Sequence, residues 1–311
     1  MPSLKGKDII SALELTREEV EHLYKVADQL KHAFETFGSL DIARNKVMIT
    51  AFFEPSTRTK ISFQMAMARL GGTVVDFLAS VSSLAKGETD YDTIRILDGY
   101  DPDIIVIRQK KPGFPAEVAP WVKAPIINAG DGYNEHPTQA LLDVYTISRE
   151  LGKVDGVHIA IMGDLKYGRT PSSLSYLLSK FNDVTIYYVA PEPLQIREEV
   201  LKNVEGKVRY ELLNDIRELR GRPVDVIYVT RLQKERLPDT SMYESLKGSY
   251  RIDAALLKEL FGDNIPIIMH PLPRTWELDT SVDPLPQAKY FQQAKNGLYV
   301  RAALIKEILG L

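Results

Sequence analysis

The 311-residue chain contains no cysteine, which excludes disulfide bonds, thiolate zinc sites and a cysteine nucleophile. It also lacks an apolar run long enough to span a bilayer, and no cationic-then-apolar leader opens it. The net charge is only −3, so no global attraction to nucleic acid or to anionic membranes is expected. We therefore expect a cytoplasmic protein that binds neither nucleic acid nor a membrane, and any anion site must be made locally.

Histidine is scarce as well. The five histidines are His22, His32, His136, His158 and His270. No two of them have the His-x-x-x-His spacing that places two metal ligands on one helix face. Because thiolate ligands are absent too, we expect neither a metal nor another cofactor. The length suits two domains, and 44% hydrophobic residues suffice for sizeable cores.

Strand-like apolar runs alternate with helical stretches along the chain. The expected strands of the first half are 47–53, 73–78, 103–107 and 125–128, and the helical stretches are 59–70, 88–99 and 114–122. A second series begins near residue 157, with strands at 157–163, 184–189, 208–212, 224–229 and 266–270. This alternation predicts an α/β protein with two doubly wound parallel-sheet domains joined by helices.

Three further helices have their own signals. Thr16 and Glu19 form a capping box that opens a helix ending near Phe37. A helix over 137–151 joins the two series, and a last helix over 298–309 is stopped by Gly310.

Hydroxyls and a guanidinium follow the first predicted strand, where the chain enters a helix. They belong to Ser56, Thr57, Arg58 and Thr59. Free backbone N–H groups and the positive end of the helix dipole collect at such a point, and an arginine fork matches phosphate oxygens. The segment therefore predicts a phosphate site. Taken alone, it fits ordinary N-caps and a solvated arginine equally well.

Polar residues follow other predicted strands, and ligands of open parallel sheets bind beyond the carboxyl ends of strands. Arg108 comes directly after the third strand, although it could instead pair with a surface carboxylate. His136 and Gln139 open the joining helix on one face. They could hold a carbonyl or amide group beside the phosphate, or His136 could simply be satisfied by backbone.

Two arginine-bearing segments follow strands of the second half. Residues 163–170 fit G-x-x-x-x-G-[basic]-T and so mimic a nucleotide P-loop, but Arg169 stands where that motif has lysine. Pro171 suits the first position of a helix, and an arginine at a helix N-terminus suits a carboxylate. Arg231 and Gln233 offer a second carboxylate grip. Two such carboxylate-binding segments would suit a dicarboxylate substrate. The alternative interpretation of residues 163–170 is a P-loop nucleotide hydrolase.

Together these residues resemble the aspartate/ornithine carbamoyltransferase superfamily, and within it the catalytic chains of aspartate carbamoyltransferases. The motifs are Phe-Phe-Glu-Pro-Ser-Thr-Arg-Thr at 52–59, His-Pro-Thr-Gln at 136–139, Gly-Asp-Leu-Lys-Tyr-Gly-Arg-Thr at 163–170, Thr-Arg-Leu-Gln-Lys-Glu-Arg at 230–236 and His-Pro-Leu-Pro-Arg at 270–274. Their order and spacing agree over nearly the whole chain. The resemblance implies transfer of the carbamoyl group of carbamoyl phosphate to L-aspartate, an early step of pyrimidine biosynthesis.

The resemblance also implies residue roles. Carbamoyl phosphate would be held by Ser56, Thr57, Arg58, Thr59, Arg108, His136, Gln139, Leu272 and Pro273, with Pro271 as a less certain member. The aspartate carboxylates would be held by Lys86, Arg169, Arg231 and Gln233. The residues with a catalytic role would be Arg58, Thr59, Arg108, His136 and Lys86.

The implied organisation is a carbamoyl phosphate-binding domain over 1–140, completed by the helix 292–311, and an aspartate-binding domain over 150–290. The working unit would be a homotrimer, in which Lys86 and Ser82 reach into the active site of a neighbouring subunit. By its place in the sequence, Ser83 is an equally good candidate for the role given to Ser82. The sequence leaves open a separate regulatory chain and any assembly beyond the trimer.

Several residues depart from the common family pattern, namely Lys60, Gln109 and Glu135. Glu135 precedes His136 and could perturb it. None of the departures removes a contacting group.

Two alternatives to the expected activity stay open. An ornithine carbamoyltransferase would share the phosphate segment but usually carries a cysteine in the motif at 270–273. A non-catalytic homologue would be expected to lack a ligand-binding residue.

Overall fold

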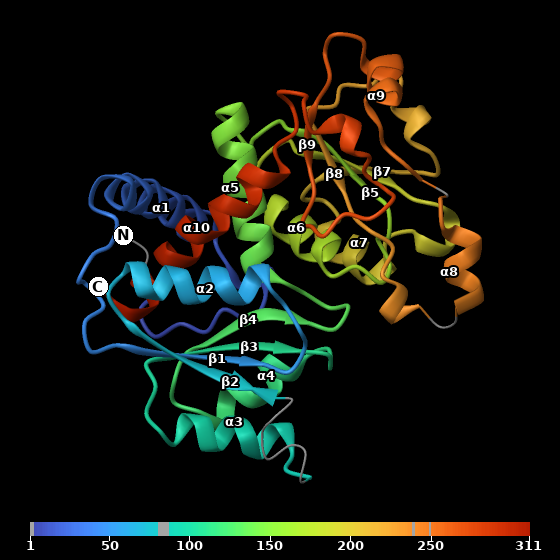
Figure 1. Ribbon diagram of the computed structural model, residues 1–311. Helices are drawn as coiled ribbons and strands as arrows, with labels where there is room; N and C mark the ends of the chain where they lie inside the picture. Colours follow the sequence, from blue (N-terminus) through green and yellow to red (C-terminus); the bar gives the residue numbers. More distant parts are fainter. Residues whose placement is uncertain (1–2, 80–86, 238–239, 249) are drawn as a thin grey trace. The chain divides into compact units, whose positions relative to one another are not determined.

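The computed structural model describes residues 3–79, 87–237, 240–248 and 250–311. The chain forms two compact units (Figure 1). The first comprises Met1–Leu142 with Lys295–Leu311, and the second comprises Asp143–Ala294. Each contains one parallel sheet with helices, which confirms the predicted α/β class with two parallel-sheet domains.

The sheet of the first unit has the order β2-β1-β3-β4. Its strands are β1 (Val47–Phe52), β2 (Thr73–Leu78), β3 (Ile104–Gln109) and β4 (Ile126–Asp131), and all neighbours are parallel. Two strands run further than predicted. Arg108 consequently lies inside β3, at an irregularity of the β3–β4 register, and does not follow the strand as expected. This irregularity, which the alternating pattern cannot reveal, lets a polar side chain sit near the strand end.

Helices cover both faces of this sheet (Figure 1). On one face lie α3 (Asp90–Asp98) and α4 (Phe114–Val118), where Ile94 and Phe114 pack against Ile49 and Ile105. On the other face lie α1 (Arg17–Phe37) and α2 (Arg58–Arg69). The alternate residues of a strand point to opposite faces, so β1 is apolar except for Thr50, and β3 is apolar up to Arg108 and Gln109 at its end. The capping box predicted for the first helix is present.

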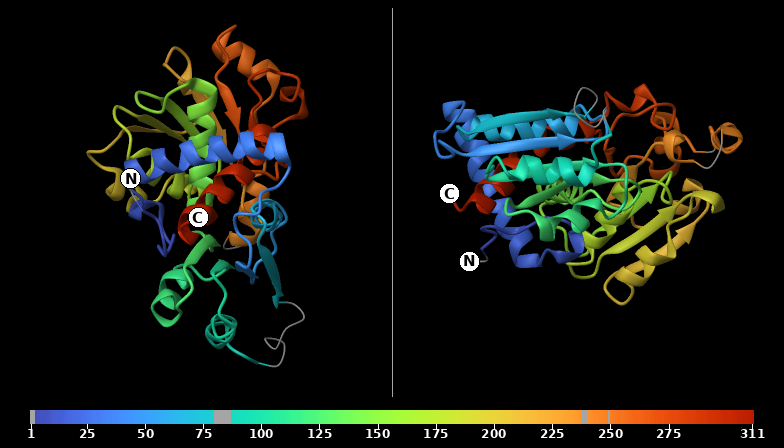
Figure 2. Two further views of the ribbon diagram at one scale, coloured as in Figure 1. Left: turned by 90° about the vertical axis from the view of Figure 1, so that its left-hand side faces the viewer. Right: turned by 90° about the horizontal axis from the view of Figure 1, so that it is seen from below.

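Helix α10 (Tyr290–Leu309) begins well before residue 298, the start predicted from the local pattern, and two residues before 292, the start that the resemblance implies. The helix includes Gly297, although glycine is unfavourable inside a helix. A Cβ at Gly297 would stand 2.6 Å from the Arg301 guanidinium, so the position needs glycine for close packing. The N-terminal segment lies beside the end of this helix, where Gly6 N–H donates to the Ile308 carbonyl at 2.9 Å (Figure 2).

The second unit has the strand order β7-β6-β5-β8-β9. Its strands are β5 (His158–Met162), β6 (Thr185–Val189), β7 (Arg209–Leu213), β8 (Val226–Val229) and β9 (Ile267–Met269), all parallel. Its helices are α6 (Thr170–Leu178), α7 (Glu198–Val204), α8 (Thr240–Leu246) and α9 (Ala254–Phe261). Because β5 and β8 are neighbours, the segments that follow them meet at one edge of the sheet.

Helix α5 (Pro137–Leu151) has the predicted bounds, and it passes from the first unit into the second, as α10 passes back. Short 3₁₀ turns complete the chain: Ala12–Glu14, Ala119–Trp121, Glu192–Leu194, Ile216–Leu219, Lys234–Arg236 and Thr280–Val282. Among the described residues, no helix combines the length and the apolar character needed to cross a membrane.

Candidate active site

The predicted phosphate segment lies where β1 gives way to α2, as expected. Thr57 is the residue before the helix, yet its backbone is helical and its side chain makes no capping hydrogen bond. The interpretation of Thr57 as an ordinary N-cap is therefore wrong. Thr57 and Arg58 are exposed, Ser56 is half-buried and Thr59 is buried. The hydroxyl groups of Ser56, Thr57 and Thr59 therefore lie at a helix N-terminus that the Thr57 side chain does not cap.

The structure brings Thr59 together with His136. Thr59 Oγ1 and His136 Nε2 lie 3.3 Å apart, and both side chains are buried. Thr138 Oγ1 lies 3.5 Å from the other ring nitrogen, Nδ1. Gln139 is largely buried in the first turn of α5, where its N–H donates to the His136 carbonyl at 3.0 Å. Residues far apart in the sequence therefore form one polar site in the first unit.

Arg108 is held from two sides. Its Nη1 donates to the Ala129 carbonyl at 3.2 Å, and its Nε lies 3.5 Å from Glu54 Oε2. The Arg108 and Glu54 side chains are only 12% and 16% exposed, so this is not the surface pair that the sequence left open. Glu54 belongs to the same segment as Ser56. It was given no role from the sequence, although its place in the motif was a usable signal.

Arg301 is a second residue that the sequence analysis missed. It is buried in α10, where Nη1 donates to Ser62 Oγ at 2.7 Å and Nη2 to Thr138 Oγ1 at 3.4 Å. Ser62 is in α2 and Thr138 in α5, so one guanidinium bridges the helix that carries Thr59 and the helix that directly follows His136. The signal was an arginine inside an otherwise apolar helical stretch.

Glu135 contacts the N-terminal segment of the chain. Its buried carboxylate accepts hydrogen bonds from Ser11 Oγ and from Ala12 N–H, the latter at 2.9 Å. The residue thus ties the N-terminal segment to the turn before α5. Lys60, another departure from the family pattern, lies 2.7 Å from Asp76 of β2.

In the second unit, Asp164 joins two of the predicted segments. This buried residue follows β5 and accepts from Tyr167 N–H at 2.9 Å and from Gln233 N–H at 3.0 Å. Burial raises the pKa of Asp164 above its ordinary value, against the hydrogen bonds from Gln233 and Tyr167. Gly163 is required beside it, because a Cβ there would stand 2.3 Å from the Thr230 carbonyl oxygen.

Arg169 and Arg231 therefore lie on segments that Asp164 links. Arg169 is buried at the N-cap of α6, and Pro171 is the second residue of this helix, not the first as predicted. Arg231 is half-buried and donates to the Leu232 carbonyl at 3.3 Å. The Tyr167 N–H is engaged by a carboxylate, whereas in a P-loop such groups cradle phosphate. The loop thus departs from a P-loop in backbone contacts as well as in its missing lysine.

Residues Pro271, Leu272 and Pro273 follow β9. Leu272 has φ 57°, the left-handed region that residues other than glycine seldom occupy. Its N–H donates to His270 Nδ1 at 2.7 Å, and the Leu272–Pro273 peptide bond is cis. The predicted site residues Lys86 and Ser82 lie outside the described residues.

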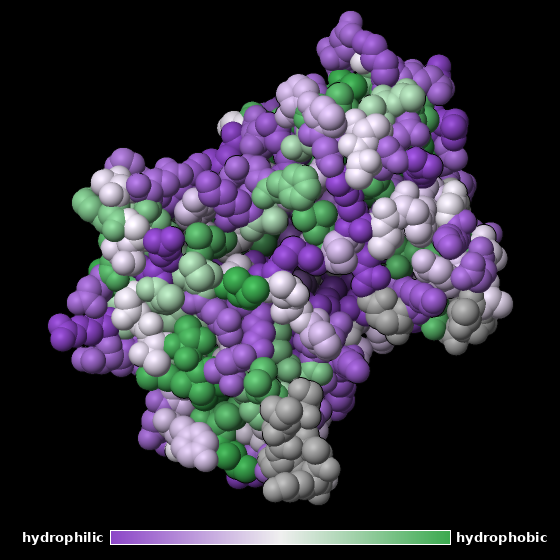
Figure 3. Space-filling view, in the orientation of Figure 1, coloured by the Kyte–Doolittle hydropathy of each residue, from purple (hydrophilic) through white to green (hydrophobic). Residues whose placement is uncertain are grey.

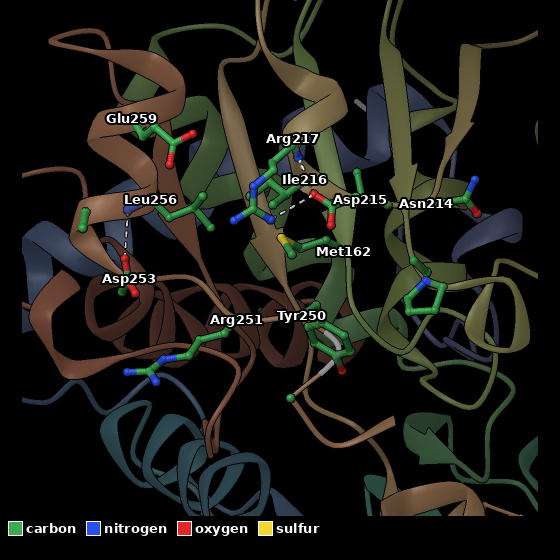
Figure 4. A pocket seen from close by; sticks show the side chains of 15 residues that line it. Met162, Asn214, Asp215, Ile216, Arg217, Tyr250, Arg251, Asp253, Leu256 and Glu259 are labelled. Atoms are coloured by element: carbon green, nitrogen blue, oxygen red, sulfur yellow. Dashed lines mark hydrogen bonds and ion pairs between the residues drawn. The ribbon is translucent and has the colours of Figure 1, made fainter. Parts of the chain in front are cut away.

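A cavity of about 450 Å³ opens beyond the ends of β5, β6 and β7 (Figure 4). None of the predicted site residues that the structure describes lines it. Its charged side chains have partners close by. Arg217 lies 3.5 Å from Asp215, and Glu259 lies 2.6 Å from Arg220. We assign no ligand to this cavity.

Comparison with known proteins identifies the family. The family model described as the carbamoyl-P binding domain of aspartate/ornithine carbamoyltransferase matches residues 7–149. The model described as the Asp/Orn binding domain matches residues 155–308. The chain belongs to the aspartate/ornithine carbamoyltransferase family. The resemblance recognised from the motifs is thereby confirmed.

Relatives within this carbamoyltransferase family are similar over their full length. The aspartate carbamoyltransferase catalytic subunit of Methanocaldococcus jannaschii is 45% identical over 97% of this chain and 98% of the relative. That of Thermoplasma acidophilum is 46% identical over 99% of both. A crystal structure of Trypanosoma cruzi aspartate transcarbamoylase with carbamoyl phosphate and aspartate is 40% identical, covers 98% of both chains and has a TM-score of 0.93.

Proposed function

We propose that this chain is an aspartate carbamoyltransferase catalytic chain. It transfers the carbamoyl group of carbamoyl phosphate to the amino group of L-aspartate and releases N-carbamoyl-L-aspartate and phosphate. The observation that carries the proposal is the buried Thr59–His136 pair at 3.3 Å, beside a helix start with uncapped hydroxyls. A relative that is 45% identical is named an aspartate carbamoyltransferase catalytic subunit.

The phosphate segment would bind the leaving group. Ser56, Thr57 and the N–H groups at the start of α2 meet the phosphate oxygens, and Arg58 stabilises the charge that grows on them. Arg58 is the first residue of the helix, so its guanidinium and the helix dipole favour the same anion.

The carbamoyl group would lie over Thr59, Arg108 and His136. The aspartate amine attacks the carbamoyl carbon, and a tetrahedral oxyanion forms there. Donors placed in advance around such an oxygen lower the barrier, because no solvent has to reorganise. Thr59 Oγ1 and His136 Nε2 are close enough to contact one oxygen atom together. Arg108 is kept in place by Glu54. The carbamoyl amino group would be bound by Gln139 and by the carbonyls of Pro271 and Leu272. Pro273 would shape this side of the site.

Arg169, Arg231 and Gln233 would hold the two aspartate carboxylates. Asp164 links their segments through the Gln233 N–H, which fixes the spacing of two cationic groups. A substrate with two carboxylates matches two guanidinium groups. Ornithine has one carboxylate and a second amine, and its enzymes usually have cysteine in the motif that reads His270-Pro271-Leu272-Pro273 here. Aspartate is therefore the favoured amino acid.

The protein would act as a cytoplasmic homotrimer with shared active sites. Strand β2 is an edge strand with exposed Val75 and Leu78, and α2 exposes Ile61 and Met65. Apolar side chains gather over this part of the first unit (Figure 3). An apolar edge of this kind needs a cover, and a neighbouring subunit would supply it together with Lys86 and Ser82. A regulatory chain could join this trimer in a larger assembly.

The test is carbamoylation of aspartate and of ornithine by the purified protein. We expect product from aspartate only, and turnover of ornithine alone would overturn the proposal. Arg58→Ala should lower turnover by about 10²–10³-fold with little effect on unfolding, since an oxyanion or leaving-group donor is lost. Arg44→Ala, which removes an exposed arginine of the same unit, is the matched control. The native mass of the complex tests the trimer.

A further inference from the structure

A buried histidine next to the proposed carbamoyl site has no role in the function described so far. His270 directly follows β9 and is 1% exposed. Its ring is bonded at both nitrogens. Nδ1 accepts the Leu272 N–H at 2.7 Å, and Nε2 lies 2.9 Å from Glu277 Oε1.

These contacts fix where the ring proton sits. A backbone N–H can only donate, so Nδ1 must offer a lone pair to Leu272. An imidazole keeps at least one proton, and here that proton is on Nε2, where it is donated to the carboxylate of Glu277. Glu277 is 0% exposed and also accepts from Thr275 N–H at 2.9 Å. Burial raises the pKa of Glu277, but the hydrogen bonds from His270 and Thr275 outweigh it and hold the pKa below its ordinary value.

The backbone of His270 is anchored as well. Its N–H donates to Gln293 Oε1 at 2.8 Å, and Gln293 Nε2 donates to Asp143 Oδ1 at 2.7 Å. The backbone of His270 is therefore held from α10 and, through Gln293, from α5, whereas its ring is held by Glu277 of the loop. The bond that Nδ1 accepts from Leu272 stabilises a residue with φ 57°, and this left-handed conformation needs support from its surroundings in a residue other than glycine.

We propose that His270 is a positioning residue: held as the Nε2–H tautomer by Glu277, it fixes the backbone at Leu272 so that the Leu272 carbonyl can bind the carbamoyl amino group. The inference rests on the proposed function, since the ligand at Leu272 is carbamoyl phosphate. His270 itself touches no reacting atom. Its effect is transmitted through one hydrogen bond to the peptide that contacts the substrate.

Two substitutions distinguish the hydrogen bond made by Nδ1 from the one made by Nε2. His270→Asn places an amide oxygen near the position of Nδ1, so it can still accept the Leu272 N–H, but it loses the donor to Glu277. His270→Gln reaches Glu277 with an amide N–H and offers no acceptor at the δ position. The two variants are alike in charge and polarity, and each is the control for the other.

We expect His270→Gln to raise the KM for carbamoyl phosphate about tenfold, the worth of one hydrogen bond. His270→Asn should stay within about threefold of the unchanged protein. The KM for aspartate should change in neither variant, because Arg169, Arg231 and Gln233 lie on other loops. Equal KM values for carbamoyl phosphate in the two variants, or parallel losses in kcat and both KM values, would overturn the proposal.

A second measurement needs no variant of His270. In the ¹⁵N NMR spectrum of histidine-labelled protein, His270 can be assigned by replacing each of the four other histidines in turn. Its Nδ1 should be unprotonated and its Nε2 protonated, and the opposite tautomer or a doubly protonated ring would refute the assignment. A native protein that forms no N-carbamoyl-L-aspartate would instead end the proposed function, and the tautomer result distinguishes that failure from failure of the positioning role.

Discussion

The bridge made by Arg301 gives a prediction that can be worked out from the structure. One guanidinium, 3% exposed, donates to Ser62 in α2 and to Thr138 in α5. It also lies over the Phe63 ring, 5.1 Å from its centroid. Arg301→Met keeps a long apolar side chain and removes these contacts with Ser62, Thr138 and Phe63. If the bridge sets the spacing of α2 and α5, this change should affect both stability and carbamoyl phosphate binding.

The expected magnitude follows from the contacts. A hydrogen bond from a charged donor contributes about 1.5–3 kcal/mol, and a desolvated cation–π contact about 2 kcal/mol. The contact with Thr138, at 3.4 Å, is close to the limit of a hydrogen bond and adds little. Removing a buried charge offsets part of the loss. We expect Arg301→Met to lower the free energy of unfolding by about 2–4 kcal/mol.

The assay is a double-mutant cycle with Ser62→Ala, measured by urea unfolding and by initial rates. The Arg301–Ser62 coupling should be about 1–2 kcal/mol. The kcat/KM for carbamoyl phosphate should fall by about tenfold or more, because small displacements of positioned groups are costly. Additive effects on unfolding, or a loss of stability with an unchanged kcat/KM, would show that the reasoning is wrong and that Arg301 only fills the core.

Three further outcomes are expected. Arg231→Ala should raise the KM for aspartate by about tenfold or more, since a bidentate carboxylate contact is lost, and an unchanged aspartate titration would contradict this. Gly163→Ala should lower the free energy of unfolding by about 2–4 kcal/mol, because its Cβ would meet the Thr230 carbonyl at 2.3 Å; thermal unfolding tests it. Asp279→Asn should destabilise the protein at neutral pH. Hydrogen bonds from Ser281 lower the pKa of Asp279 to about 2 from its ordinary 3.8, so this stabilisation is present above about pH 4 and disappears as pH falls to about 2; a constant difference across that range in acid-unfolding curves would refute it.

The sequence was sufficient for the architecture because parallel strands buried on both faces leave continuous apolar runs. Every predicted strand is present, and α5 has the predicted bounds. Boundaries failed where packing overrode local propensity. The local pattern placed the start of the last helix at residue 298, but α10 continues through Gly297, where a Cβ would stand 2.6 Å from the Arg301 guanidinium. Similarly, the register irregularity near Arg108 depends on β4, a partner that local patterns do not contain.

For the site, the motifs gave the residues proposed to bind the substrates and missed the residues that contact and position them. Glu54, Asp164 and Arg301 were given no role, because their function appears only when distant segments meet. Asp164 accepts from Gln233 N–H, a residue 69 positions away, and Arg301 donates to Ser62 across 239 positions. A sequence motif records groups that are close along the chain, so the motifs contain Glu54 and Asp164 but do not show which distant residues they contact.

The two helices that pass between the units carry supports for both of them. In the first unit, Thr138 of α5 and Arg301 of α10 meet beside His136. In the second unit, Asp143 of α5 accepts from Gln293 of α10, and Gln293 in turn accepts the His270 N–H. Each helix therefore contributes one buried polar group on either side of the boundaries at residues 142 and 294. Buried polar groups of this kind are costly unless they are fully paired, so they define the register of α5 against α10 within each unit. The same pair of helices thus carries buried polar contacts within each unit, through Thr138 and Arg301 in the first and through Gln293 and His270 in the second.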